Sequence, residues 1–219
     1  MRIARLNSEP EIFYSIQGEG ARTGSPAVFI RTAGCNLHCS WCDTKHSWGN
    51  GIELTEQEAA QRILHYKAPG LVITGGEPLM QTTALERLLS LLPTDIFIEV
   101  ETNGTIPPSP VLIQRVHQWN VSPKLQHAGN QETTLLPEIL HAFAATERAW
   151  FKFVISQEKD WSAIETLGLP QHRIILMPCA ATHAQLQEKR HEIVQLCLKH
   201  KVRFGDRLHI TLWGEKKGV

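Results

Sequence analysis

Short apolar runs rich in β-branched residues alternate with helix-like segments along this chain, and this alternation constrains the fold more than any other feature. The runs predicted as strands are residues 27–32, 71–74, 95–102, 119–122, 149–155, 173–177 and 208–212. Alternating strands and helices favour right-handed crossovers and a mostly parallel sheet. A closed eight-fold barrel typically has about 250 residues, whereas this chain has 219. We therefore expect an α/β fold, a partial (incomplete) TIM-like barrel of parallel strands formed by one domain, residues 1–219.

Capping residues and apolar spacing predict the helices between these strands. Thr55 and Glu58 form a capping box, in which each side chain accepts a hydrogen bond from the other residue's backbone N–H. A second capping box is expected at residues 83–86, followed by leucines at helical spacing. Pro137 suits the first turn of a further helix. The remaining helices are expected at about residues 159–167 and 183–201.

Charge and hydropathy exclude several classes of function. Lys and Arg number 22 and Asp and Glu number 22, so the formal net charge is zero. Duplex nucleic acid requires surplus Lys and Arg for phosphate contacts, so no direct nucleic-acid partner is expected. No apolar run has the length of a membrane span, and the first residues lack the apolar stretch of a signal peptide. We therefore expect a cytoplasmic, globular protein with no membrane partner.

Three of the five cysteines, Cys35, Cys39 and Cys42, fall within eight residues. An odd, clustered set without an export signal is not typical of a disulfide framework. Three thiolates at such short spacings can hold an iron–sulfur cluster and leave one iron open to a small molecule. The alternative is a structural zinc site of three Cys and one His, either His38 or His46. Spacing alone does not identify the metal, although a domain with its own core does not need zinc to fold.

Polar or glycine-rich loops follow four of the predicted strands. They are the cluster loop (residues 33–50) and the segments 75–78, 102–104 and 122–124. In parallel α/β folds, ligands bind at the carboxyl ends of the strands. We therefore expect the four loops to meet at one rim of the sheet and to form a site there.

The cysteine motif, with Trp41 immediately before Cys42, resembles the signature of the radical S-adenosylmethionine (SAM) enzymes. Gly75-Gly76-Glu77-Pro78 resembles their second motif, which binds the methionine amino group, and glycine lets a backbone approach a ligand closely. The resemblance implies a radical SAM core with a [4Fe–4S] cluster whose open iron binds SAM. In these enzymes electron transfer cleaves SAM to a 5′-deoxyadenosyl radical, while the protein positions the cofactors and excludes water.

Further segments resemble the 7-carboxy-7-deazaguanine synthase family, namely residues 13–20, 29–31, 42–45, 72–78, 99–105 and 121–125. The resemblance implies a carbon–nitrogen lyase that also uses Mg²⁺. Its reaction converts 6-carboxy-5,6,7,8-tetrahydropterin to 7-carboxy-7-deazaguanine with loss of ammonia, in the biosynthesis of queuosine, a tRNA modification, and of related 7-deazapurines. The resemblance also implies a homodimer and a flavodoxin- or ferredoxin-type electron donor.

The same resemblance assigns roles to residues of the predicted rim. It implies that the cluster is bound by Cys35, Cys39 and Cys42. It implies that SAM is contacted by Trp41, Cys42, Asp43, Gly76, Ser122, Pro123 and Lys124. It implies that the pterin is contacted by Ile16, Gln17, Gly18, Arg31 and Thr74. Finally, it implies that Mg²⁺ is contacted by the hydroxyl of Thr44.

The chemistry of these side chains suits the implied ligands. Arg31 carries a forked guanidinium that can bind the substrate carboxylate through two hydrogen bonds. Gln17 offers both a donor and an acceptor to a pterin edge. Mg²⁺ prefers oxygen ligands and retains waters, so Thr44 with substrate oxygens would make a weak site. Glu99 and Glu101 are expected to face solvent or pair with Lys, with at most a supporting role.

Some features leave the function open. The C-terminal stretch 207–214 differs from the family's usual tail, so no C-terminal substrate contact is carried over, and Met177-Pro178 stands where Gln-Pro is frequent. Cys197 is expected to be a buried thiol and Cys179 a bystander. Two alternatives are a radical SAM activase that acts on a partner protein, and a non-enzymatic zinc or electron-transfer module. Gln17 to Gly20 and Arg31 favour a small anionic substrate over a polypeptide.

Overall fold

The computed structural model describes residues 1–130 and 134–219. Its parallel strands are β5 (Pro26–Thr32), β7 (Gly70–Gly75), β8 (Phe97–Thr102), β9 (Gln118–Val121), β10 (Ala149–Ile155), β11 (Ile174–Pro178) and β12 (Arg203–Phe204). Its antiparallel strands are β1 (Arg2–Ile3), β4 (Ile12–Ile16) and β6 (Ile52–Glu53), beside a separate hairpin of β2 (Arg5–Leu6) and β3 (Glu9–Pro10).

The main sheet is open. Its order is β12-β11-β10-β9-β8-β7-β5-β1-β6, with β4 paired to β5. Within the described ranges the two outermost strands of this order, β12 and β6, do not pair with each other, so the sheet curves without closing. The prediction of a partial barrel of parallel strands is therefore confirmed.

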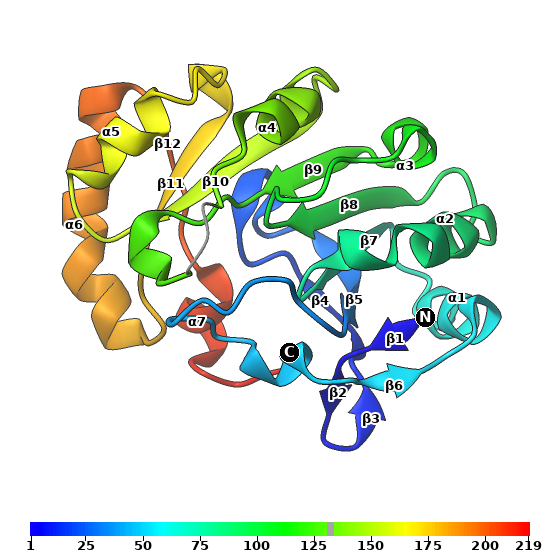
Figure 1. Ribbon diagram of the computed structural model, residues 1–219. Coiled ribbons are helices and arrows are strands. Elements are labelled where there is room, and N and C mark those ends of the chain that lie inside the picture. Colours follow the sequence, from blue (N-terminus) through cyan, green and yellow to red (C-terminus); the bar gives the residue numbers. More distant parts are fainter. Residues whose placement is uncertain (131–133) are drawn as a thin grey trace.

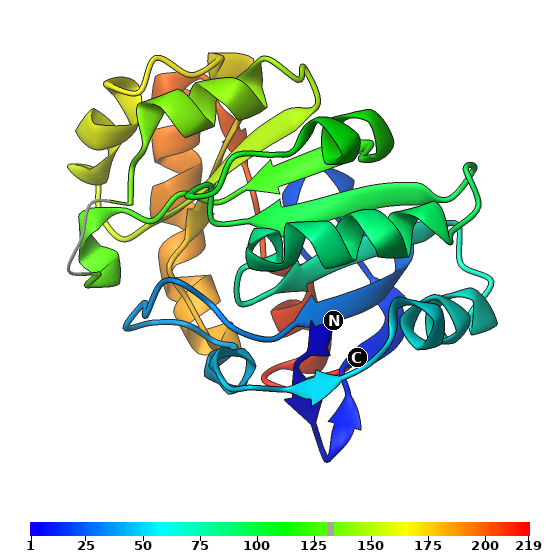
Figure 2. The same ribbon diagram turned by 45° about the vertical axis from the view of Figure 1, so that its right-hand side comes forward.

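The helices are α1 (Glu56–His65), α2 (Thr82–Ser90), α3 (Pro110–Arg115), α4 (Pro137–Ala144), α5 (Asp160–Glu165), α6 (His183–His200) and α7 (Leu208–Trp213). Helices α1 to α6 lie along the outside of the curved sheet, whereas α7 and the C-terminus lie beside the cluster loop (Figures 1 and 2). Among the described residues, no helix combines the length and the apolar character needed to cross a membrane.

The core lies between the sheet and these outer helices. Trp119 of β9 and Phe143 of α4 are completely buried, and their rings meet edge to face with centroids 5.2 Å apart. Leu85 and Leu88 of α2 are also completely buried, as the leucine spacing of that helix predicts. Such burial contributes about 1.5–3 kcal/mol per large side chain. The packed outer face leaves the carboxyl ends of the strands free to carry a site.

Two sequence predictions of secondary structure are wrong. Residues 208–212 form helix α7 and not a strand, because the backbone N–H of Leu208 donates to the carbonyl of Gly18 and draws the segment away from the sheet edge. The capping box at residues 83–86 does not form, because α2 continues directly from a preceding 3₁₀ turn, Pro78–Gln81. Glu86 instead accepts a hydrogen bond from Ser109 Oγ at 2.5 Å.

Several short elements escaped prediction. Strands β1, β2, β3, β6 and β12 have two residues each, too few to show a period of two. Helix α3 also escaped prediction; Pro110 occupies its first turn, and the Ser109 side chain accepts from the backbone N–H of Leu112. Proline lacks the N–H that a first turn leaves unpaired, so it begins a helix as readily as it ends one.

Candidate active site

A pocket of about 750 Å³ opens at the carboxyl ends of the parallel strands. The residues of the predicted site that line it are Ile16, Gln17, Gly18, Arg31, Cys35, Cys39, Trp41, Cys42, Asp43, Thr44, Thr74, Gly76, Ser122 and Lys124. Pro123 is buried behind this lining. The structure thus brings together residues that lie more than a hundred positions apart in the sequence, as expected if several strand ends contribute to one rim.

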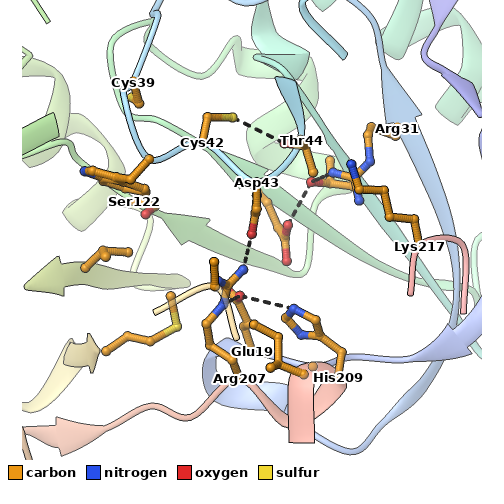
Figure 3. A pocket seen from close by; sticks show the side chains of 18 of the residues that line it. Glu19, Arg31, Cys39, Cys42, Asp43, Thr44, Ser122, Arg207, His209 and Lys217 are labelled. Atoms are coloured by element: carbon orange, nitrogen blue, oxygen red, sulfur yellow. Dashed lines mark hydrogen bonds and ion pairs between the residues drawn. The ribbon is translucent and has the colours of Figure 1, made fainter. Parts of the chain in front are cut away.

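The cluster loop follows β5 and carries the three motif cysteines into the pocket, as Figure 3 shows for Cys39 and Cys42. All three are free thiols, and burial raises the pKa of Cys35. Within residues 1–130 and 134–219, no three Cys, His, Asp or Glu side chains are placed to hold one metal ion. The loop therefore gathers the cysteines in one pocket without focusing them on a single point.

The two histidines of the zinc alternative have other partners. The His38 ring meets Trp48 edge to face, with centroids 5.1 Å apart. The His46 Nε2 atom lies 2.8 Å from Glu11 Oε2. Neither arrangement presents an imidazole nitrogen to the three cysteines together, and both disfavour a structural Cys₃His zinc site.

The Gly75–Pro78 turn packs directly against the cluster loop. A Cβ atom on Gly76 would lie 2.8 Å from Cys35 Cβ and would overlap the carbonyl oxygen of Gly34, so only glycine fits. Glu77 is fully buried, and its carboxylate accepts hydrogen bonds from Leu79 N, Thr102 Oγ1 and Asn103 N. Burial raises the pKa of Glu77, and these three donors oppose the rise.

Lys124 and Trp41 lie on the β9 side of the pocket. Lys124 Nζ donates to Ser122 Oγ at 3.0 Å and lies 5.5 Å from the Trp41 ring centroid. Burial lowers the pKa of Lys124, and nearby Lys152 lowers it further. The Trp41 indole N–H is buried without a hydrogen-bond partner among the described residues. The Lys124 ammonium group can interact with an aromatic ring or a carboxylate, and the unpaired Trp41 N–H can donate a hydrogen bond. Both groups therefore suit an aromatic ligand that carries a carboxylate.

Arg31 extends into the pocket from β5. Its Nε donates to Glu11 Oε1 at 2.8 Å, and its Nη1 lies 3.5 Å from Thr74 Oγ1. Burial opposes the charged form, but Glu11 outweighs burial and raises the pKa of Arg31. Thr74 in turn donates to Glu101 Oε2 at 2.8 Å. The guanidinium is therefore charged and anchored on one side, with its terminal nitrogens at the pocket.

Gln17 lies between two carboxylates, and the expectation that Glu99 faces solvent is wrong. Gln17 Nε2 donates to Glu99 Oε1 at 2.5 Å and to Glu101 Oε1 at 3.1 Å. Glu99 is 2% exposed and also accepts from Asn120. Burial, with the neighbouring Glu101 carboxylate, raises the pKa of Glu99 to about 7. These polar groups sit among apolar strands because each strand sends alternate side chains to the inner face.

A group of charged side chains, Glu19, Asp43, Lys152, Arg207 and His209, lines the same pocket. Glu19 accepts from Arg207 Nε at 2.8 Å and also pairs with Lys152. Asp43 pairs with Arg207 as well, and Figure 3 shows this pair. Burial raises the pKa of Glu19, but the two cations outweigh it and hold the pKa well below its usual range. Arg207 thus connects the C-terminal segment with the cluster loop.

Proteins of known identity resemble this chain over nearly its whole length. A model of the radical SAM superfamily matches residues 29–128. The 7-carboxy-7-deazaguanine synthase of Pyrobaculum aerophilum is 39% identical over 216 residues, which cover 95% of each chain. The Chlorobaculum tepidum protein of that name is 36% identical and covers 95% of this chain and 96% of its own. The crystal structure of QueE from Escherichia coli matches with a TM-score of 0.65 and 27% identity, over 90% of this chain and 92% of that chain.

The chain belongs to the 7-carboxy-7-deazaguanine synthase family. It is therefore a radical SAM enzyme of 7-deazapurine biosynthesis, with a [4Fe–4S] cluster and SAM as cofactors. The residues present fit these groups. Three thiols enter one pocket, Gly76 gives close backbone access beside Cys35, and Lys124 and the unpaired Trp41 N–H face the same space.

Sequence reasoning missed several pocket residues of this family member. Lys152 had a visible signal, because it interrupts the otherwise apolar run of β10. Glu19 lies inside a segment already singled out, but its partners Arg207 and His209 come from the C-terminal stretch, where no contact was expected. Residues 214–219 also line the pocket, and Lys217 Nζ lies 3.5 Å from His46 Nδ1. Nothing in the local sequence indicates that this tail returns to the site.

The raised pKa of Glu99 predicts a pH-dependent stability. Glu99 is protonated more readily in the folded than in the unfolded state. The free energy of unfolding of the wild type therefore falls relative to that of Glu99→Gln as pH rises from the unfolded-state pKa of about 4.3 to the folded-state pKa of about 7. The change reaches up to about 3 kcal/mol. Urea unfolding of both proteins between pH 4.5 and 7.5 measures this change, and each extrapolated free energy of unfolding has an uncertainty of about 10–15%. A difference that does not change with pH would contradict the assignment.

Proposed function

We propose that this chain converts 6-carboxy-5,6,7,8-tetrahydropterin to 7-carboxy-7-deazaguanine with loss of ammonia. The observation that carries the proposal is that the three cysteines and the anchored Arg31 guanidinium open into the same pocket of about 750 Å³. Ligand pockets commonly have volumes of about 300–1,000 Å³, so this space suits small molecules. The relatives named 7-carboxy-7-deazaguanine synthase support the same substrate.

The chain's own residues bind and orient the substrate. When bound, the cluster and SAM supply radical hydrogen abstraction. Arg31 binds the pterin carboxylate, and Glu11 fixes its side chain. Gln17, held by Glu99 and Glu101, presents its amide to a pterin edge. Pre-organised donors of this kind lower the cost of orienting the substrate.

The protein also fixes the cofactor contacts and excludes water. Cys35, Cys39 and Cys42 would hold the cluster, and Gly76, Ser122 and Lys124 would lie along SAM. The charged pair of Arg207 and Glu19 joins the C-terminal segment to the pocket wall. A pocket wall completed in this way limits the access of solvent to reactive species.

The direct test is a reaction with purified protein. Anaerobically reconstituted, reduced protein is incubated with SAM and the carboxytetrahydropterin, and products are identified by mass spectrometry. We expect 7-carboxy-7-deazaguanine together with 5′-deoxyadenosine. A Cys39→Ala variant, which loses a cluster ligand, should yield neither product. Formation of 5′-deoxyadenosine by the wild type without any deazapurine would refute the substrate assignment.

Replacing Arg31 tests the carboxylate contact. Arg31→Lys keeps the charge but loses the fork, so we expect KM for the pterin to rise by about tenfold or more, with a smaller change in kcat. Steady-state kinetics measures both constants. Arg62→Lys, on the exposed face of α1, is the matched control and should leave both constants unchanged. An unchanged KM in Arg31→Lys would remove Arg31 from the substrate site.

We also propose that Thr44 contacts Mg²⁺. Its side chain lines the pocket beside Cys42, with the hydroxyl oxygen 3.6 Å from the Cys42 sulfur. Thr44→Ala should raise the Mg²⁺ concentration needed for half-maximal activity by roughly tenfold without reducing iron content. Thr166→Ala, at the exposed end of α5, serves as the control. If Thr44→Ala has the Mg²⁺ dependence of the wild type, the contact does not exist.

We also propose that a flavodoxin- or ferredoxin-type protein donates the electron. The cluster loop lies at the surface, where Asn36, His38 and Ser40 are exposed, and this exposure supports access by such a donor.

We further propose that the protein forms a homodimer. An aromatic surface supports this proposal, since Tyr14 and Tyr66 stack on each other and are 49% and 39% exposed. Light scattering would detect a dimer.

We propose a cytoplasmic location. The five cysteines are free thiols, as is usual in the cytoplasm, and this supports the proposal.

A further inference from the structure

Each cysteine sulfur of the cluster motif lies beside a hydrogen-bonding group. The Leu37 backbone N–H donates to Cys35 Sγ at 3.4 Å, and Thr44 Oγ1 lies 3.6 Å from Cys42 Sγ. Asn130 Nδ2 donates to Cys39 Sγ at 3.3 Å. The first two groups belong to the cluster loop itself, whereas Asn130 reaches the loop from the segment after β9.

The orientation of the Asn130 amide is determined by a second hydrogen bond. Its Oδ1 accepts from the backbone N–H of His38 at 3.0 Å. A backbone N–H can only donate, so the atom facing His38 must be the amide oxygen. The amide nitrogen therefore faces Cys39, the most buried of the three motif cysteines at 6% exposed.

The segment that carries Asn130 is attached to the cluster loop independently of this side chain. The Ser40 backbone N–H donates to the carbonyl of Ala128 at 2.9 Å, and the ring of His127 stacks on Trp41 with centroids 6.0 Å apart. Gly129 adopts a left-handed conformation, with φ of 75°, and turns the chain toward Cys39. Removal of the Asn130 amide should therefore leave the loop in place.

We propose that Asn130 is a positioning residue that raises the reduction potential of the cluster through Cys39. The inference rests on the proposed function, since it assumes a cluster bound by this cysteine. Reduction adds negative charge that is shared with the thiolate ligands, and an N–H···S hydrogen bond stabilises this charge. Hydrogen bonds to the sulfurs are among the determinants of iron–sulfur potentials. Asn130 thereby makes the electron needed for SAM cleavage easier to accept.

Redox titration of the reconstituted protein, followed by electron paramagnetic resonance without substrate, tests this role. Asn130→Ala should lower the equilibrium constant for one-electron reduction by roughly tenfold, a shift of about 59 mV to a more negative potential. Asn130→Asp keeps an acceptor for His38 but loses the donor, so its potential should fall at least as far. Asn36→Ala is the matched control, because the Asn36 side chain bonds Thr105 and Asn103 and, within residues 1–130 and 134–219, no sulfur. Its potential should match the wild type.

The outcomes separate this inference from the proposed reaction. Unchanged potentials in Asn130→Ala and Asn130→Asp, with full iron content, would overturn the role of Asn130. Loss of iron in both variants would also overturn it, since Asn130 would then serve cluster assembly and not its potential. A shifted potential in the variants supports the inference even if the wild type yields no deazapurine, a result that would contradict the proposed function alone.

Discussion

The hydrogen bonds of the buried Glu77 carboxylate determine how the rim is assembled. The carboxylate accepts from Leu79 in its own turn, from Thr102 at the end of β8 and from Asn103 directly after it. The Glu77 backbone N–H donates to the carbonyl of Gly34 at the start of the cluster loop. One fully buried residue therefore fixes three loops that leave three neighbouring strands. Removing it would leave several buried donors unpaired, each at a cost of about 1–3 kcal/mol. The cysteines, the glycine turn and the β8 loop can share a pocket because this carboxylate connects them.

A second layer of interactions attaches distant parts of the chain to that rim. Arg207 pairs with Glu19 before β5 and with Asp43 in the cluster loop, and it donates to the carbonyl of Ala180 after β11. Among the described residues the sheet does not close on itself. The C-terminal segment contributes to the lining, so that residues from near both ends of the chain line one pocket. A short barrel thereby gains a wall that a closed barrel would obtain from further strands.

The sequence predicted the parts of this structure that depend on local pattern. All parallel strands except β12 follow from apolar runs, the long helices follow from capping residues and spacing, and the site loops follow from their places after strands. The C-terminal helix α7, read as a strand, depends instead on a contact between Leu208 and Gly18 across the molecule. Glu99 was expected to face solvent or to pair with Lys, because a charged residue is seldom buried, but hydrogen bonds from Gln17 and Asn120 permit its burial. Asn130 belongs to none of the sequence motifs, and only the fold shows that it faces Cys39.

We infer that three cysteines at the rim hold a cluster and leave one iron for SAM. The most direct measurement is iron, sulfide and zinc analysis of anaerobically reconstituted protein, followed by electron paramagnetic resonance of the reduced cluster with and without SAM. We expect about four irons per chain, as in a [4Fe–4S] cluster, and a spectrum that changes when SAM is added. Stoichiometric zinc without iron, or a cluster whose spectrum SAM does not alter, would refute the inference.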